Sequence, residues 1–163
     1  MDFKTIQIGN QTWMAENLKL TDDGLDRDHW KNPKNGEVYY SWDAAMRLAK
    51  KVPCFHLPTS KEWNQLAEAC GCVYEDTEES NPDLQDYNNT DDLKKKLVIK
   101  LVGWYETGNK DFFSIRSLAN FWTSTEKDNK NAYNRHFGNG DYMRSRHIYK
   151  KYGLSVRLVK DKE

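Results

Sequence analysis

The chain must build its hydrophobic core mainly from aromatic side chains. Only 37% of its 163 residues are apolar and 31% are charged, yet it contains six Trp, nine Tyr and six Phe. Each aromatic side chain can bury roughly 150–250 Å² of surface, so a few of them replace many aliphatic residues. Disordered chains are poor in these residues. We therefore expect a single folded domain over residues 1–163.

The charges balance overall but are distributed unevenly. The chain has 25 Lys and Arg against 25 Asp and Glu, for a net charge of +0. This balance argues against a nucleic-acid partner, because such partners are bound by neutralising phosphates. The stretch from 75 to 92 contains acidic residues and no Lys or Arg, whereas Lys and Arg outnumber Asp and Glu from 127 to 163. The simplest interpretation is a solvated loop and a solvated face.

No segment predicts a membrane span or a leader. No apolar run approaches the roughly 20 residues that cross a bilayer. Residues Met1 to Trp13 alternate apolar and polar side chains, which is not the pattern of a signal peptide. Two compartments stay open: an intracellular one, and one reached through a leader that has been removed.

The first half of the chain predicts a hairpin and two helices. Residues 3–14 alternate around a Gly9-Asn10 turn, which favours a β-hairpin; a loop over 21–36 and a short strand over 38–40 follow. A helix is expected from the N-cap Ser41 to about Lys51, with one apolar stripe of Trp42, Ala45, Met46 and Ala49.

The second helix carries the clearest local signal. Thr59 and Glu62 form a capping box, in which each side chain bonds the other residue's backbone N–H. Gly71 is placed to end the helix. The expected buried stripe is Trp63, Leu66, Ala67 and Cys70.

The second half predicts a long acidic loop over 73–90, a short helix from Asp91 to about Leu101, and then strands. Val98 and Ile99 also suit a strand. Strands are expected over 121–124 and 132–137; a third begins at 141–144 after a Gly138-Asn139-Gly140 turn, and a fourth covers 153–159. In the last strand, Leu154, Val156 and Leu158 alternate with Ser155, Arg157 and Val159. Two helices packed on a small antiparallel sheet, with long irregular loops, make an α+β domain.

Candidate catalytic and metal-binding residues are few. His56 would serve as a general base only beside a hydrogen-bonding partner, and a histidine held by neighbouring backbone is the simpler interpretation. With Cys70 and Cys72 it offers three zinc ligands, but structural zinc sites favour four. A structural calcium site stays open among carboxylates that lack the ordered spacing of an EF-hand: Asp83, Asp86, Asp91 and Asp92. The motifs G-x-S-x-G, G-x-G-x-x-G and the P-loop are absent, so we assign no catalytic residue and no cofactor.

The cysteines do not predict a disulfide framework, because their number is odd. A bridge from Cys54 to Cys70 or Cys72 stays open. Buried, reduced thiols are the simpler interpretation.

The segment from Asn131 to Tyr152 is the richest candidate for a ligand-binding surface. Tyr and Arg dominate binding hot spots because they combine contact area with directional hydrogen bonds. With Asn and Gly, the same mixture is typical of adaptable binding loops. The ordinary polar rim of a sheet is the alternative. The candidate ligand-binding residues are Tyr133, Asn134, His136, Asn139, Asp141, Tyr142, Arg144, Arg146, His147 and Tyr149.

Several blocks together resemble one protein family, the Fibrobacter succinogenes major paralogous domain. They span nearly the whole chain in the family's order: residues Thr5–Leu18 (TIQIGNQTWMAENL), Tyr40–Met46 (YSWDAAM), His56–Trp63 (HLPTSKEW), Phe121–Glu126 (FWTSTE), Asn131–Tyr133 (NAY) and Tyr152–Arg157 (YGLSVR). The resemblance implies a C-type lectin-like fold of the variety seen in formylglycine-generating enzymes. It also implies a bacterial surface or secreted protein.

The resemblance further implies a hypothesis for the Asn131 to Tyr152 segment, which lies between two of these blocks like an insert. Some proteins of this fold are ligand-binding targets of diversity-generating retroelements, which vary residues near the C-terminus. The chain departs from the family in having a short Asp111 to Asn120 segment and no cysteine pair before the first helix. The copper-binding cysteines of formylglycine-generating enzymes match no motif here.

Three functions are therefore weighed. The leading hypothesis is a non-enzymatic recognition domain whose ligand is a protein or a carbohydrate. The second is a metal- or thiol-dependent enzyme related to formylglycine-generating enzymes, and the third is a structural surface module.

Overall fold

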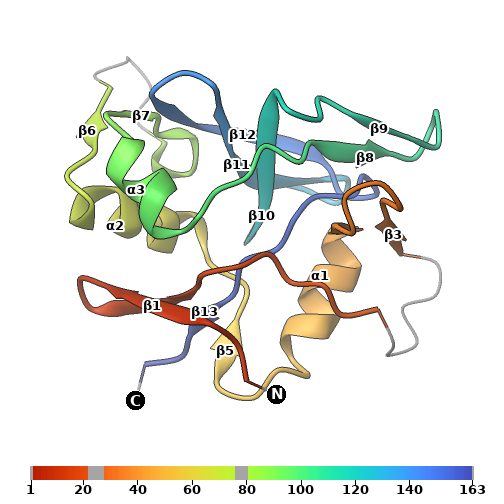
Figure 1. Ribbon diagram of the computed structural model, residues 1–163, viewed down its shortest axis with the longest axis horizontal. Coiled ribbons are helices and arrows are strands. Elements are labelled where there is room, and N and C mark those ends of the chain that lie inside the picture. Colours follow the sequence, from red (N-terminus) through yellow and green to blue (C-terminus); the bar gives the residue numbers. More distant parts are fainter. Residues whose placement is uncertain (1, 22–27, 76–80, 163) are drawn as a thin grey trace.

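The computed structural model describes residues 2–21, 28–75 and 81–162, and it shows an α+β domain (Figure 1). Within these ranges the helices are α1 (Trp42–Ala49), α2 (Ser60–Ala69), α3 (Asp91–Lys96) and the short 3₁₀ helix η1 (Pro82–Leu84). No helix of the described residues has the length and apolar character that a membrane span needs.

Two small antiparallel sheets and two ribbons contain the strands. The larger sheet has the order β10-β11-β12-β7-β6, and the smaller has the order β1-β2-β13-β5. The larger is built from β6 (Val73–Tyr74), β7 (Tyr87–Asn88), β10 (Leu118–Glu126), β11 (Asn131–Gly138) and β12 (Tyr142–Tyr149). The smaller is built from β1 (Thr5–Ile8), β2 (Gln11–Met14), β5 (Phe55–His56) and β13 (Val159–Lys160). The ribbons pair β3 (His29–Lys31) with β4 (Val38–Tyr40), and β8 (Trp104–Glu106) with β9 (Asp111–Phe113).

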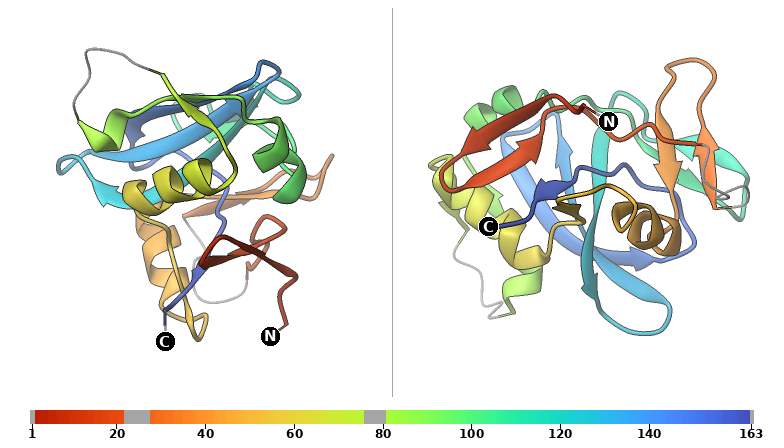
Figure 2. Two further views of the ribbon diagram at one scale, coloured as in Figure 1. Left: turned by 90° about the vertical axis from the view of Figure 1, so that its left-hand side faces the viewer. Right: turned by 90° about the horizontal axis from the view of Figure 1, so that it is seen from below.

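The two ends of the chain meet in the smaller sheet, since Val159 of β13 lies between Trp13 of β2 and His56 of β5. Both termini therefore lie at the same end of the molecule (Figures 1 and 2). The larger sheet and the β8–β9 ribbon lie at the opposite end.

The two longer helices begin where the sequence predicts. The Ser41 hydroxyl accepts a bond from the Ala44 backbone N–H, and the capping box of Thr59 and Glu62 is formed in full. Gly71, at φ +74°, ends α2 in a conformation that glycine adopts at little cost. The predicted stripe of α2 is buried. The stripe of α1 is rotated, because Ala44 and Leu48 are fully buried while Trp42 and Met46 are only partly so.

The core confirms the prediction from composition, because aromatic rings form much of it. One cluster packs α1 against Met14, Trp122 and Val156. A second packs α2 between the two sheets, where Trp63 contacts Trp13 and the rings of Phe121 and Phe137. Each cluster joins side chains from both sheets, so the domain is held together through these two helices.

Other predicted elements need correction. The loop expected over 21–36 contains β3, and the acidic loop expected over 73–90 contains β6, η1 and β7. The helix α3 ends at Lys96, five residues early, because its end turns into Val98, at φ +49°. The strand expected over 153–159 is reduced to isolated bridges followed by β13. All side chains of this segment are buried, so the predicted alternation does not separate core from solvent. Leu154, Val156 and Leu158 belong to one core cluster, and Val159 belongs to the other.

Candidate recognition surface

The segment predicted to bind a ligand forms the central hairpin of the larger sheet and is not an insert. The strand β11 pairs with β10 on one side and with β12 on the other. Side chains alternate between the two faces, so neighbours in sequence point in opposite directions. The ten candidate residues therefore do not share one surface. Tyr133 and Asn134 are only 7% and 2% exposed, which corrects the expectation that they lie on it.

One face of this hairpin is packed against α2 and is structural. Arg135 is fully buried there, and its guanidinium donates to the carbonyls of Ser60 and Asp83 and to Asn64 Oδ1. Burial lowers the pKa of Arg135 to about 10, so the side chain is still charged at neutral pH. These bonds tie the sheet to α2 and η1, which explains why this Arg is not available to a ligand.

The turn between β11 and β12 is held by α3. The Asp141 carboxylate accepts bonds from the Thr90 backbone N–H at 2.5 Å and from the Thr90 hydroxyl at 3.3 Å. The Lys94 ammonium donates to the carbonyls of Gly138 and Gly140 at 3.2 and 2.8 Å. Asn139 is exposed at the tip of the turn. Asp141 therefore positions the hairpin.

The other face carries a polar group around Tyr142. The Arg144 guanidinium lies 4.6 Å from the centre of the Tyr142 ring, and the His136 ring stands edge-on to it at 6.4 Å. Arg144 is also paired with Glu75 at 2.9 Å. Burial, reinforced by Arg146, lowers the pKa of His136 to about 4. The imidazole is therefore neutral at physiological pH, and it would contribute hydrogen bonds and not charge.

The far end of the hairpin is open to solvent. Arg146, His147 and Tyr149 are exposed at the end of β12, although Arg146 is paired with Asp86 at 2.9 Å. The His147 ring stands edge-on to Tyr133 at 6.2 Å, which fixes its orientation. This end of β12 therefore presents three exposed candidate residues.

A row of aromatic rings continues from this open end. Tyr149 contacts Tyr152 at 5.4 Å between ring centroids, Tyr152 contacts Trp104 at 5.2 Å, and Trp104 contacts Phe113 at 5.8 Å. We name these four residues the aromatic strip. Tyr149 and Phe113 are 36% and 37% exposed, and the two central rings are partly exposed.

Three members of the aromatic strip were not predicted from the sequence. Trp104 and Phe113 lie on β8 and β9, which form a hairpin around Thr107-Gly108-Asn109. This turn, between two short aromatic runs, is the signal that could have revealed the ribbon. The contact with Tyr152 could not be found this way, because it joins segments far apart in the sequence.

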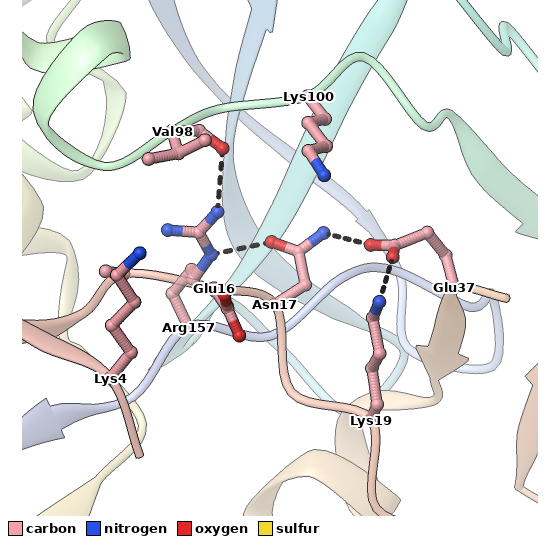
Figure 3. Close-up of a pocket in the computed structure, with 9 residues that line it drawn as sticks. Lys4, Glu16, Asn17, Lys19, Glu37, Val98, Lys100 and Arg157 are labelled. Atoms are coloured by element: carbon pink, nitrogen blue, oxygen red, sulfur yellow. Dashed lines mark hydrogen bonds and ion pairs between the residues drawn. The ribbon is translucent and has the colours of Figure 1, made fainter. Parts of the chain in front are cut away.

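A separate polar cleft of about 150 Å³ lies around Arg157 (Figure 3). The Arg157 guanidinium donates to Asn17 Oδ1 and to the carbonyls of Met14, Leu97 and Val98. Asn17 in turn donates to Glu37 at 2.7 Å. Figure 3 shows Lys19 and Lys100 pointing toward this Asn17–Glu37 pair from opposite sides. The network joins the N-terminal segment, the end of α3 and the C-terminal segment, so we assign it a role in folding.

His56 is held by side-chain carboxylates, and not by backbone as expected. Its Nδ1 lies 2.6 Å from Asp161, and its Nε2 lies 2.8 Å from Glu62. Burial alone would lower the pKa of His56, but the hydrogen bonds and charges of Asp161 and Glu62 outweigh it and raise the pKa. The ring joins the C-terminal segment to the start of α2.

Replacing His56 with Gln should therefore destabilise the domain most at mildly acidic pH. A folded-state pKa above the unfolded value of 6.5 gives stability that is fully present below pH 6.5 and is lost as the pH rises through the folded pKa. Thermal unfolding of wild-type and H56Q protein from about pH 5.5 to about pH 9 measures this. The difference in Tm should shrink as the pH rises; a difference that stays constant would show that the pairing is not ionic.

Burial makes two of the three thiols, Cys70 and Cys72, unsuited to act as nucleophiles. Cys54 is exposed and Cys70 is buried, so the expectation of three buried thiols is wrong for Cys54. Burial raises the pKa of Cys70, and it raises the pKa of Cys72 to about 12. A thiol with a raised pKa is a poor nucleophile.

Two of the four acidic residues considered for calcium have other partners. Asp86 accepts from the Ser145 N–H and pairs with Arg146, and Asp92 pairs with Lys96. Across residues 2–21, 28–75 and 81–162, no group of three His, Cys, Asp or Glu residues is arranged to hold a metal ion.

Comparison with known proteins decides the family. The sequence model of the Fibrobacter succinogenes major domain matches residues 6–160. The chain belongs to this family. No curated protein and no solved structure matches the chain. In the structure, the first and last family-like blocks contact each other, because Asn17 of the first block accepts a hydrogen bond from Arg157 of the last at 2.6 Å.

Proposed function

We propose that this Fibrobacter succinogenes major domain is a non-catalytic recognition domain that binds its ligand at the open end of β12. The observation that carries the proposal is the continuity of exposed candidate residues with the aromatic strip. His147 and Tyr149 are exposed, and Tyr149 begins a row of four rings that contact one another. Aromatic side chains that are held in place and partly exposed are typical of binding hot spots.

We leave three of the ten candidate residues out of the proposed ligand contact. Tyr133 and Asn134 are buried, and Asp141 is engaged with Thr90. The remaining candidates form two sets. The first set lies at the open end of β12: Arg146, His147 and Tyr149. The second set lies at the turn and in the polar group around Tyr142: His136, Asn139, Tyr142 and Arg144. We place the ligand at His147 and Tyr149 of the first set, because Glu75 holds Arg144, Asp86 holds Arg146, and Arg144 already contacts Tyr142.

We also propose a fold subclass and a cellular location for the domain. The α+β arrangement is compatible with a C-type lectin-like fold of the variety seen in formylglycine-generating enzymes, and the resemblance in sequence supports it. A role at the bacterial surface or outside the cell rests on the same resemblance. Diversification by a retroelement would be confined to outward-facing positions, because Arg135, Phe137 and Met143 in the same hairpin are core residues.

The test is a selection with the purified domain. A glycan array and a phage-displayed random peptide library are screened with wild-type protein, with the variant His147→Ala/Tyr149→Ala, and with a control, Gln7→Ala/Lys160→Ala. The control changes two exposed residues of the smaller sheet, at the opposite end of the molecule. Ligands retained by wild-type and control protein should be lost by the H147A/Y149A variant. Equal retention by all three proteins, or no ligand at all, would overturn the proposal.

A further inference from the structure

The aromatic strip has a rigid foundation. Tyr105 and Gly153 exchange two backbone hydrogen bonds of 2.8 Å, which join β8 to the turn after β12. The Tyr152 N–H donates to the Tyr149 carbonyl at 3.1 Å within that turn. Trp104 and Tyr152 also pack against the core cluster beneath α1. The four rings are therefore positioned before any ligand arrives, which lowers the entropic cost of binding.

Three rings of the aromatic strip carry a polar atom that makes no hydrogen bond to the described residues. Trp104 Nε1 and the hydroxyls of Tyr149 and Tyr152 have no hydrogen-bond partner there, whereas buried Trp122 and Trp13 both use their indole N–H. A ring of this kind offers an apolar face for stacking and a polar edge for hydrogen bonds. A ligand that matches it must itself combine apolar C–H faces with hydroxyl groups at the edges.

Two charged groups near the open end of β12 are already bonded within the domain. The Lys150 ammonium is bonded to Glu126 at 2.5 Å and lies 4.5 Å from the centre of the Trp42 ring. Asp128 accepts bonds from the backbone N–H groups of Lys130 and Asn131. Because these two charges are already bonded, they add little attraction for a charged ligand.

The exposed area decides between a carbohydrate and a folded protein. No ring of the strip is much more than a third exposed. Since a full aromatic side chain can bury roughly 150–250 Å², the strip exposes on the order of 300 Å² at most. A standard protein–protein interface needs about 800 Å² from each partner. The strip is therefore too small to be the apolar centre of such an interface, and its size suits a few sugar rings.

We infer that the aromatic strip binds a neutral carbohydrate chain, with sugar rings stacked on Trp104, Tyr152 and Tyr149. This inference rests on the proposed function and specifies its ligand class. The C–H face of each sugar packs on a ring, and its hydroxyls bond the indole N–H and the phenol hydroxyls.

Titration with defined sugars tests the inference. Linear hexasaccharides of glucose, xylose, mannose and galactose are titrated into ¹⁵N-labelled wild-type protein, and the Trp104 indole resonance is followed by NMR. At least one hexasaccharide should shift that resonance. Tyr149→Ala and Trp104→Ala should each weaken its binding about tenfold or more, while Trp104→Phe, which keeps an aromatic face, should retain most of it.

A matched control separates stacking from a general loss of stability. Tyr74→Ala removes another exposed tyrosine, 39% exposed on β6 and outside the strip, and it should leave sugar affinity unchanged. Tyr149→Ala is the decisive variant, since Tyr149 is exposed and its loss should not unfold the domain. The inference fails if no hexasaccharide binds wild-type protein, or if Tyr149→Ala binds as tightly as Tyr74→Ala. If peptides selected on the wild-type domain lose binding in the H147A/Y149A variant while all sugars fail, the recognition function stands and the carbohydrate class is wrong.

Discussion

Replacing Trp63 with Ala is expected to destabilise the domain by about 3–5 kcal/mol. Trp63 is fully buried on α2, and its ring lies 4.7 Å from Trp13, 5.5 Å from Phe121 and 6.3 Å from Phe137. Alanine would leave a cavity at the point where α2 joins both sheets, and surrounding rings could fill it only in part. Chemical denaturation measures the loss, which is a large share of the 5–15 kcal/mol that typically stabilises a domain.

The variant Trp63→Phe provides the control for this prediction. The Trp63 indole N–H is buried without a hydrogen-bond partner among the described residues, so replacing it removes an unsatisfied donor. W63F should therefore cost clearly less than W63A, about 1–2 kcal/mol. If W63A lost no more than about 1 kcal/mol, the two core clusters would not depend on α2 in the way described.

Replacing Arg157 with Met should cost a similar amount, about 3–5 kcal/mol, by a different mechanism. Methionine keeps much of the side-chain volume but donates nothing to Asn17 or to the carbonyls of Met14, Leu97 and Val98. These acceptors would remain buried or partly buried without their donor. Burial lowers the pKa of Arg157 to about 10, so its charge persists at neutral pH and strengthens each of these bonds.

The variant Arg157→Lys tests whether the fork of the guanidinium matters. An ammonium keeps the charge but has only three donors on one atom, so it cannot reach acceptors spread over two segments. We expect R157K to lose at least half as much stability as R157M in the same denaturation experiment. If R157K were as stable as wild-type protein, charge alone would explain the role of Arg157.

Local signals in the sequence located the starts of the two longer helices and the turn of the central hairpin. Ser41 and the Thr59–Glu62 pair mark where α1 and α2 begin, because a cap is decided by residues that lie within one turn. The Gly138-Asn139-Gly140 turn likewise placed β11 and β12. Composition correctly indicated an aromatic core, since few other residues in the chain could supply the buried area.

Features that depend on distant contacts could not be predicted in the same way. The alternation of side chains along β11 and β12 predicts two faces. No local sequence signal predicts that α2 covers the face that carries Arg135. The aromatic strip is assembled from β8, β9 and the turn after β12. The Arg157–Asn17 bond joins residues 140 positions apart. A stretch rich in Tyr and Arg therefore indicated the region of a candidate surface, but only the fold separates its exposed residues from its buried ones.

The central claim is that the exposed end of β12 binds the ligand, and calorimetry tests it most directly. For a ligand obtained from the glycan array or the peptide library, the Kd is measured for wild-type protein, for H147A/Y149A and for the control Q7A/K160A. We predict that H147A/Y149A binds about thirtyfold more weakly, as expected when hot-spot residues are removed, with Tm close to the wild-type value. The control should bind as wild-type protein does. A Kd for H147A/Y149A within about twofold of the wild-type value would contradict the claim and would place recognition elsewhere on the domain.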